Sequence, residues 1–302
     1  PMYQPVPIQE AIKQIKVHIE SKNILQLSQI MAQYNFNQRY DILQLYQSVN
    51  HKNLVQELAD LTAPNSDIIK NLFENRYDYW SKFIDQKLRT QQMENLLGLV
   101  LLMTDKEKIK VMQSYKSVYQ KDLFDVLLTT QSTDHKMTDV YQFMYTQIKQ
   151  VNKQQVDHND VVDRLAKVKD QQCSVKIQIF SQIMTSINAV IFKQVSELFE
   201  MKHKVTLRDF IKQIFQDKTM MYAMLLQHDC LIGQSQGVAT AIKNALQRKD
   251  KDSIITLTVL WSDFYRGAAI QEAFKKFGDL KQDVCKLFDG EQCQVILSLW
   301  RL

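Results

Sequence analysis

Proline and glycine are scarce in this chain of 302 residues, which contains only four prolines and six glycines. Three of the prolines lie within the first seven positions, and none follows Pro64. Because proline breaks the interior of a helix and glycine weakens it, this scarcity permits helix along almost the whole chain. It also argues against glycine-rich loops that bind phosphate through backbone N–H groups, and no G-x-x-x-x-G-K-[ST] motif occurs.

Long apolar runs and a basic leader are also missing. The apolar run Leu96–Met103 is far too short to cross a bilayer, which takes about 20 residues. The first seven residues are neither basic nor followed by an apolar run, so we expect no signal peptide. These two features predict a soluble, cytoplasmic protein.

Charge and cysteine content exclude two further classes of protein. The formal net charge is +5, but the lysines are scattered among acidic residues, as on an ordinary solvated surface. We therefore expect no nucleic-acid partner. Cys173, Cys230, Cys285 and Cys293 show no C-x-x-C spacing, and four cysteines are too few to staple a chain of this length. We expect them to be reduced thiols in the core.

The chain does contain an internal repeat. The segment Ser48-Val-Asn-His-Lys-Asn-Leu54 returns 69 residues later as Ser117-Val-Tyr-Gln-Lys-Asp-Leu123, and weaker forms end at Leu207 and Leu280. These four leucines are 69, 84 and 73 residues apart, which predicts four units of about 70 residues with an insertion between the second and the third. Such units are stacked modules that bury their apolar faces against their neighbours.

The apolar spacing inside a unit has helical period. Ile8, Ile12, Ile15 and Ile19 share one helix face, and the same spacing predicts five short helices in each unit, with Asn37 and Asn65 as N-caps in the first. Residues 146–157 have no convincing apolar face and are the expected connector. The predicted parts are a tail (1–7), repeat I (8–76), repeat II (77–145), the connector (146–157), repeat III (158–230) and repeat IV (231–302).

Four repeats of five short helices resemble the annexin family. Asn37-Gln-Arg39 is similar to the connection between the second and third helices of an annexin repeat, and Lys121-Asp-Leu-Phe-Asp125 is similar to the start of the fourth helix. Asp279-Leu-Lys-Gln-Asp283 and Ile296-Leu-Ser-Leu299 resemble the end of the last repeat. Among annexins the chain most resembles the divergent protozoan alpha-giardins. The resemblance implies an all-α fold of four annexin-type repeats that form a curved slab.

The same resemblance implies a function. Annexins bind anionic phospholipids such as phosphatidylserine through calcium, and the alpha-giardins imply a link to the plasma membrane or the cytoskeleton. A rigid slab can place several weak contacts on one membrane, and linked weak contacts multiply. The alternative is a calcium-independent helical-repeat scaffold that binds protein partners, including cytoskeletal proteins.

The standard annexin calcium sites cannot be carried over to this sequence. Calcium takes roughly six to eight oxygen ligands, and annexins supply them from a glycine-rich loop after the first helix and a carboxylate further on. None of the corresponding loops contains a glycine: 21–24, 88–92, 169–172 and 247–252. The expected closing positions are Asp60, Thr129, Gln213 and Lys286. Only Asp60 is acidic, so any calcium site must be weak or of another kind.

The best candidate of another kind is the turn Phe288-Asp-Gly-Glu-Gln292. Asp289, Glu291 and the carbonyl group of Gly290 could form a partial calcium shell there. The alternative interpretation is a C-cap glycine followed by a helix whose first turn carries favourable acids. Asp60 with Asp67, and Asp134 with Asp139, are weaker candidates, and each of these residues is more typical of a solvated acid at a helix end than of a calcium ligand.

Nothing in the sequence predicts an enzyme. Gly233-Gln-Ser-Gln-Gly237 matches the nucleophile elbow of serine hydrolases, but that motif needs a strand before the serine, and residues 220–226 have helical character. We therefore expect Ser235 to be an N-cap. The six histidines form no zinc motif, and most are expected at the surface or in turns. Trp80, Trp261 and Trp300 are expected in the core.

Overall fold

The computed structural model describes residues 6–61, 65–130, 135–149, 153 and 156–302, and it is helical throughout those ranges, with no strand among them. The all-α fold of repeated helices is therefore confirmed. No helix in the described ranges has both the length and the apolar character needed to cross a membrane.

Five α-helices recur along each stretch of the chain that the repeats predict. The first set is α1 (Ile8–Glu20), α2 (Ile24–Met31), α3 (Phe36–Asn50), α4 (Leu54–Ala59) and α5 (Ser66–Asn71). The second is α6 (Arg76–Arg89), α7 (Met93–Val100), α8 (Asp105–Tyr119), α9 (Leu123–Thr129) and α10 (His135–Ile148). The third is α11 (His158–Ala166) with η1 (Lys167–Asp170), α12 (Cys173–Ser186), α13 (Ala189–His203), α14 (Leu207–Ile214) and α15 (Lys218–Ile232). The fourth is α16 (Gln234–Gln247), α17 (Lys251–Trp261), α18 (Ala268–Phe274) with η2 (Lys275–Phe277), α19 (Leu280–Leu287) and α20 (Gly290–Trp300).

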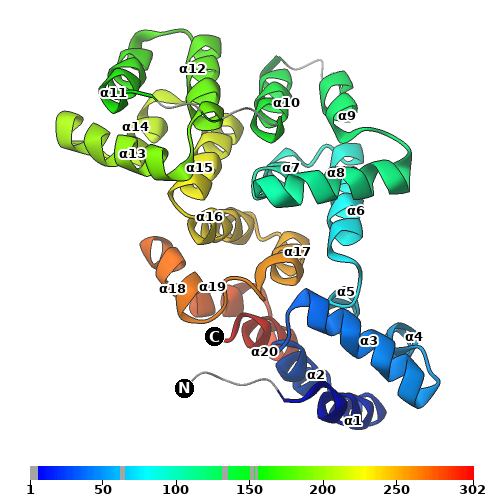
Figure 1. Ribbon diagram of the computed structural model, residues 1–302. Helices are drawn as coiled ribbons and strands as arrows, with labels where there is room; N and C mark the ends of the chain where they lie inside the picture. The colour runs from blue at the N-terminus through cyan, green and yellow to red at the C-terminus, as the bar shows by residue number, and fades with distance from the viewer. Residues whose placement is uncertain (1–5, 62–64, 131–134, 150–152, 154–155) are drawn as a thin grey trace. The chain divides into compact units, whose positions relative to one another are not determined.

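The helices gather into two compact units. Unit 1 consists of Pro1–Tyr79 with Ile242–Leu302, and unit 2 of Trp80–Ala241. Unit 1 thus combines the first set of helices and the start of α6 with the last set from Ile242 of α16 onward, and in it α2 packs along α20 (Figure 1). Unit 2 combines the rest of the two middle sets with the first part of α16, and in it α10 packs against α12 while α15 packs against α7.

The repeated leucines open equivalent helices. Leu54, Leu123, Leu207 and Leu280 are the first residues of α4, α9, α14 and α19, and all four are buried. The residue before each of them is an N-cap whose side chain accepts a hydrogen bond from a backbone N–H of the first turn: Asn53, Asp122, Thr206 and Asp279. The sequence repeat therefore marks a capped and buried helix start, as predicted.

The helix before each repeated leucine also ends in a common way. In the first three repeats it ends at a residue in the left-handed region, with φ of 53° at His51, 54° at Gln120 and 57° at Lys204. Gly278, with φ of 125°, stands at the corresponding place in the fourth. Residues other than glycine are strained in the left-handed region, yet three different side chains occupy it here. The repeats therefore share the backbone conformation of this turn and not a particular residue.

Two details differ from the sequence expectations. The N-cap of α3 is Asn35, which forms a capping box with Gln38, rather than Asn37, which lies inside the helix. Helix α10 continues to Ile148, so the first three residues of the expected connector are helical, and Gln147 and Ile148 are buried. Ile148 is the apolar contact that the polar composition of residues 146–157 concealed.

A buried aspartate organises the core of unit 1. The carboxylate of Asp263 accepts a hydrogen bond from the backbone N–H of Phe36 at 3.0 Å and lies 3.8 Å from the guanidinium of Arg76. Arg76 in turn covers the ring of Trp261 at 4.9 Å. Burial lowers the pKa of Arg39 to about 10, and the charge of Asp263 opposes that shift. One negative charge therefore balances buried cations from distant parts of the sequence.

Replacing Asp263 with asparagine should destabilise the protein by about 3–5 kcal/mol, because Arg76 and Arg39 would remain buried without a counter-charge. Urea unfolding followed by circular dichroism measures this change. Asp67→Asn removes an exposed carboxylate that pairs with Lys70, and it should change the free energy of unfolding by less than about 1 kcal/mol. Equal effects of the two substitutions would contradict this role of Asp263.

Candidate functional site

The turn between the first and second helices has one geometry in three of the repeats. Lys22, Gln91 and Lys249 occupy its left-handed position, with φ of 54°, 52° and 55°. In the first repeat the N–H of Lys22 donates to the carbonyl of Ile19 and the N–H of Asn23 to that of His18, and the other two turns repeat this pair of bonds. This is a Schellman motif, which closes the end of the preceding helix. In the third repeat η1 replaces it.

These turns do not fit the calcium loops that the annexin resemblance implies. The left-handed positions carry lysine or glutamine in place of glycine, and exposed ammonium groups oppose a divalent cation. The closing positions are equally unsuitable. Thr129 donates its hydroxyl to the carbonyl of Asp125 in its own helix, and Lys286 pairs with Asp283 at 3.0 Å. Asp60 accepts a hydrogen bond from the side chain of Gln56.

The turn between α19 and α20 is open to solvent. Asp289 is the N-cap of α20, but its side chain makes no capping hydrogen bond. Gly290 has φ of 49° and is the first residue of α20, so it is not the C-cap of α19 that the alternative interpretation required. No heavy atom lies within 4 Å of the position that a Cβ of Gly290 would occupy. The carboxylate of Asp289 and the backbone of Gly290 are therefore accessible.

A residue from the first repeat reaches this turn. The side-chain amide of Asn65, at the start of α5, donates to the carboxylate of Glu291 at 3.0 Å. Asn65 is only 4% exposed, and its Oδ1 atom is buried with no hydrogen-bond partner among the described residues. The sequence placed Asn65 correctly as an N-cap position, but its side chain makes no capping bond. No local pattern links two residues that are 226 positions apart.

The unpaired oxygen of Asn65 allows the chemistry of these residues to be compared with the ligands that calcium prefers. An amide oxygen and the carboxylates of Asp289 and Glu291 are the hard oxygen ligands that calcium takes in proteins. These groups have the chemistry of calcium ligands, and a complete shell would need further oxygens from water or a phosphate group. Within the described ranges, no group of three or more His, Cys, Asp or Glu residues could hold a metal ion.

The other acidic candidates have contacts or positions away from this turn. Asp67 pairs with Lys70 at 2.7 Å in its own helix. Asp139 lies in α10, in the other unit, and Asp134 falls outside the described residues.

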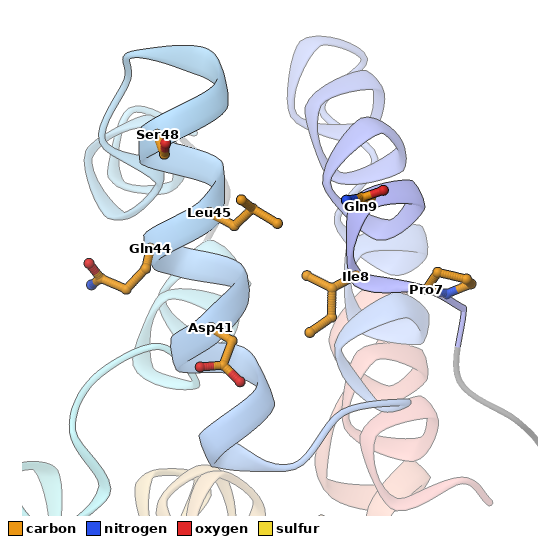
Figure 2. Close-up of a pocket in the computed structure, with 7 residues that line it drawn as sticks. All are labelled: Pro7, Ile8, Gln9, Asp41, Gln44, Leu45 and Ser48. Atoms are coloured by element: carbon orange, nitrogen blue, oxygen red, sulfur yellow. The ribbon is translucent and has the colours of Figure 1, made fainter.

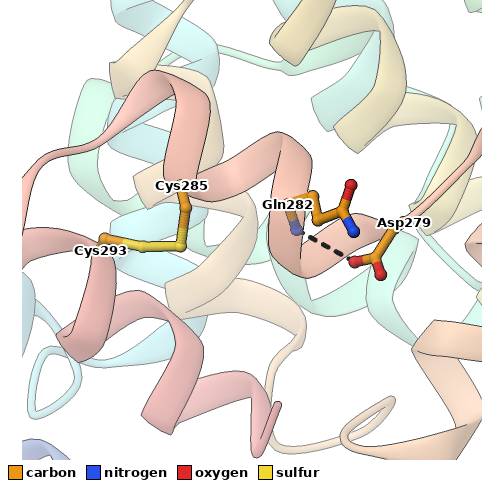
Figure 3. The surroundings of a disulfide bond; sticks show 4 residues. All are labelled: Asp279, Gln282, Cys285 and Cys293. Carbon is orange, nitrogen blue, oxygen red and sulfur yellow. Dashed lines mark hydrogen bonds between the residues drawn. A yellow bond between two sulfur atoms is a disulfide. The ribbon is translucent and has the colours of Figure 1, made fainter.

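A disulfide bond closes the same turn, contrary to the expectation of reduced cysteines. Cys285 of α19 is bonded to Cys293 of α20 (Figure 3), with the Cα atoms 5.6 Å apart. Both line a hollow of about 670 Å³ that also includes Asp289 and Gly290. Cys173 is exposed, so only Cys230 is a buried or half-buried free thiol. Cysteine spacing fails to reveal this bridge because helix packing, not a motif, brings the two residues together.

Breaking this disulfide should destabilise unit 1 by about 2 kcal/mol, because a cross-link over eight residues removes loop entropy from the unfolded chain. Cys285→Ser and Cys293→Ser should lower the thermal midpoint equally, and dithiothreitol should lower that of the unmodified protein by the same amount. Cys173→Ser is the matched control. A midpoint that dithiothreitol leaves unchanged would contradict the bridge.

A second hollow in unit 1 offers fewer charged groups. It measures about 640 Å³ and lies between the start of α1 and the middle of α3, where Figure 2 shows Ile8 and Leu45 pointing toward each other across the gap. Asp41 is the one charged residue in its lining. The hollow shares no residue with the turn at Asp289.

The serine motif is not a nucleophile elbow. Helix α15 runs to Ile232, so a helix rather than a strand precedes Ser235. Ser235 lies in the first turn of α16 and is not its N-cap. A side chain at Gly237 would collide with the sulfur of Cys230, so the second glycine serves the packing of α16 on α15.

The aromatic and histidine expectations have different outcomes. All three tryptophans are buried, as predicted: Trp80, Trp261 and Trp300. His228 is an exception among the histidines, because it is buried and contacts Asp229 at 2.9 Å.

Comparison with known proteins gives full-length matches. No family model matches the chain. Giardin subunit alpha-1 of Giardia intestinalis is 20% identical over 98% of this chain and 99% of its own, and giardin subunit alpha-5 of the same organism is 21% identical over 95% of both. The solved structure of calcium-bound alpha-1 giardin has a TM-score of 0.88 and 19% identity over 98% of this chain and 99% of its own. Annexin III has a TM-score of 0.74 and 15% identity over 98% and 94%.

These matches define the fold class. The chain has the annexin fold, which it shares with solved giardins and annexins. It is similar over its full length to alpha-giardins, in agreement with the resemblance seen in its sequence.

Proposed function

We propose that this protein binds anionic phospholipid membranes in a calcium-dependent manner through unit 1, as a peripheral protein of the plasma membrane or its cytoskeleton. The observation that carries the proposal is the meeting of Asn65 with Glu291 beside the open turn at Asp289 and Gly290. Calcium bound there would join these oxygens to a lipid phosphate. Alpha-1 giardin, whose solved structure is calcium-bound, supports the same chemistry.

Basic residues beside this turn support a membrane as the partner. The ammonium group of Lys251, at the start of α17, lies 5.5 Å from the ring centre of Phe288, which directly precedes Asp289. Lys249 is exposed in the turn before α17. Such cations attract anionic headgroups, and the attraction weakens as salt rises.

An incomplete ligand set makes calcium and lipid depend on each other. Two carboxylates and one amide oxygen leave several coordination positions for water or phosphate oxygens. Calcium should therefore bind weakly without vesicles and more tightly with them, and by linkage lipid binding should rise with calcium to the same degree. The lysines provide a weaker attraction that persists in chelator.

Removing the two carboxylates should abolish the calcium-dependent part of membrane binding. Asp289→Asn with Glu291→Gln should reduce co-sedimentation with phosphatidylserine vesicles in calcium to the level seen in chelator. Asp41→Asn with Glu272→Gln makes the same change of charge at exposed positions of unit 1 and should retain the calcium response. Identical binding of the unmodified protein in calcium and in chelator would reject the proposal.

Asn65 permits a test in the opposite direction. Asn65→Asp adds a carboxylate beside Glu291, so it should raise calcium affinity about tenfold, by analogy with other charge-assisted contacts, while lowering stability without calcium. Isothermal titration with calcium and thermal melts in chelator measure the two effects. A loss of stability with no gain in affinity would mean that the pair is only structural.

One observation favours the second candidate function, a calcium-independent scaffold for protein partners. Exposed apolar residues recur at equivalent positions of α3 and α8: Tyr40 and Val49 on the first, Ile109 and Val118 on the second. Tyr40 and Val49 lie nine residues apart, on opposite sides of α3, so a protein partner would contact each recurring position separately and not one continuous patch.

Under the scaffold alternative, Val49→Asp with Val118→Asp should abolish co-sedimentation with purified microtubules or actin filaments, in calcium and in chelator alike. Val17→Asp changes an equally exposed valine of α1 and serves as the control. An absence of binding to both filaments would remove this alternative for cytoskeletal partners.

A further inference from the structure

Unit 2 contains a polar cavity of about 670 Å³ that the proposed function does not use. It lies where α7 and α12 end, where α8 and α13 begin, and near the ends of α10 and α15. The turns between first and second helices lie at the opposite ends of α7 and α12. These helices have 8 and 14 residues, so about 12–20 Å of helix separates the cavity from those turns.

Three lysines and a single acidic residue line this cavity. Lys108 donates to the carboxylate of Asp105 at 3.1 Å and to the carbonyl of Gln147 at 3.0 Å. Lys153 donates to the carbonyl of Thr185 at 2.9 Å, and Lys149 is the third cation. The charged lining is therefore net positive, and two of its cations are held in place by backbone carbonyls.

The lysine environment favours an anion. Burial lowers the pKa of Lys153, with Asp105 opposing the shift and the like charge of Lys108 adding to it. Burial would raise the pKa of Asp105, but the charge and hydrogen bond of Lys108 together with the charge of Lys153 outweigh burial, and the pKa falls below its ordinary value. By accessible surface, Lys149 and Lys153 are exposed, and only Lys108 is largely withdrawn from water, with its side chain 15% exposed. Lys108 should therefore gain the most from a bound anion.

Gln147 places a buried amide in the wall of the cavity. Its side-chain amide group donates to the hydroxyl of Ser181 at 3.0 Å. Gln147 is 4% exposed, and its Oε1 atom is buried without a hydrogen-bond partner among the described residues. Because that atom has no exposed surface, it is an unpaired acceptor within the wall and not a contact for a ligand.

We propose that this cavity binds a small ligand with several phosphate groups, which Lys108, Lys149 and Lys153 would contact. The volume falls within the range of small-molecule sites, roughly 300–1,000 Å³. An inositol phosphate has this chemistry, whether free in solution or as the headgroup of a lipid.

The primary test is isothermal titration of the full chain with inositol 1,4,5-trisphosphate in chelator, which excludes a calcium bridge. Lys108→Gln with Lys153→Gln should weaken binding at least about tenfold, the usual scale of charge-assisted hydrogen bonds. Lys149→Gln is a milder variant at an exposed position. Lys202→Gln with Lys212→Gln removes two exposed lysines of unit 2 and should leave the affinity unchanged.

Two further variants separate the charges of the cavity from its uncharged wall. Asp105→Asn removes the only acid of the lining and should tighten binding several-fold, which no loss of structure would cause. Gln147→Met removes an amide whose acceptor is not exposed in the cavity, and it should leave the affinity for the trisphosphate unchanged. Thermal melts verify that each variant is folded.

Vesicles that contain phosphatidylinositol 4,5-bisphosphate, compared with the free trisphosphate, identify the source of the ligand. Competition between the two would show that one cavity takes both, and binding of the free form alone would assign a soluble ligand. The proposal is overturned if the trisphosphate does not bind, if the surface-lysine control loses as much affinity as the cavity variant, or if Asp105→Asn fails to tighten binding. Because chelator is present, a failure here leaves calcium-dependent membrane binding unaffected.

Discussion

A buried carboxylate surrounded by cations is the interaction on which each unit depends. In unit 1, Asp263 faces Arg76 and caps the start of α3 through Phe36. In unit 2, Asp229 accepts from Arg208 at 3.2 Å and also contacts His228 and Thr240. A buried charge is tolerated only when its partners are present and correctly oriented. Each aspartate thus requires helices from two repeats to meet in one register, and that requirement positions everything else in the unit, including the turn at Asp289 and the lysine cavity.

The packing of the repeats and their chemistry depend on different residues. Buried leucines, N-caps and left-handed helix ends recur with the period of the sequence, and they need only apolar volume and local hydrogen bonds. Calcium needs oxygen atoms aimed at a point, which the standard turns of this chain do not supply. The donors that suit calcium come from the junction of repeats I and IV, where Asn65 meets Glu291. Under the proposed function, the calcium site lies between repeats, and the turns within the repeats lack calcium ligands.

The sequence predicted the parts of the fold that rest on local physics. Leu54 and Leu123 were identified from spacing alone, because the buried first residue of each helix directly follows its N-cap and the pair is therefore visible in the sequence. The turn at Asp289 and Gly290 was also identified, because glycine between two acids is a local pattern. The orphaned oxygen of Asn65, the bridge from Cys285 to Cys293 and the acceptor of Gln147 could not be predicted. Each depends on side chains from separate helices, and in the case of Asn65 the partner is 226 residues away.

Among the described residues, seven helix ends in the left-handed conformation carry side chains where glycine would be unstrained: Lys22, His51, Gln91, Gln120, Lys204, Lys249 and Arg301. Each such residue is disfavoured by roughly 1 kcal/mol, an amount that the greater freedom of glycine in the unfolded chain only partly offsets. The turns of this fold would therefore be more stable with glycine at these positions than they are with the side chains present. The thermal stability of the protein is therefore lower than the same fold permits. The lost stability is spread over surface turns, so single substitutions to glycine can raise it without altering the core.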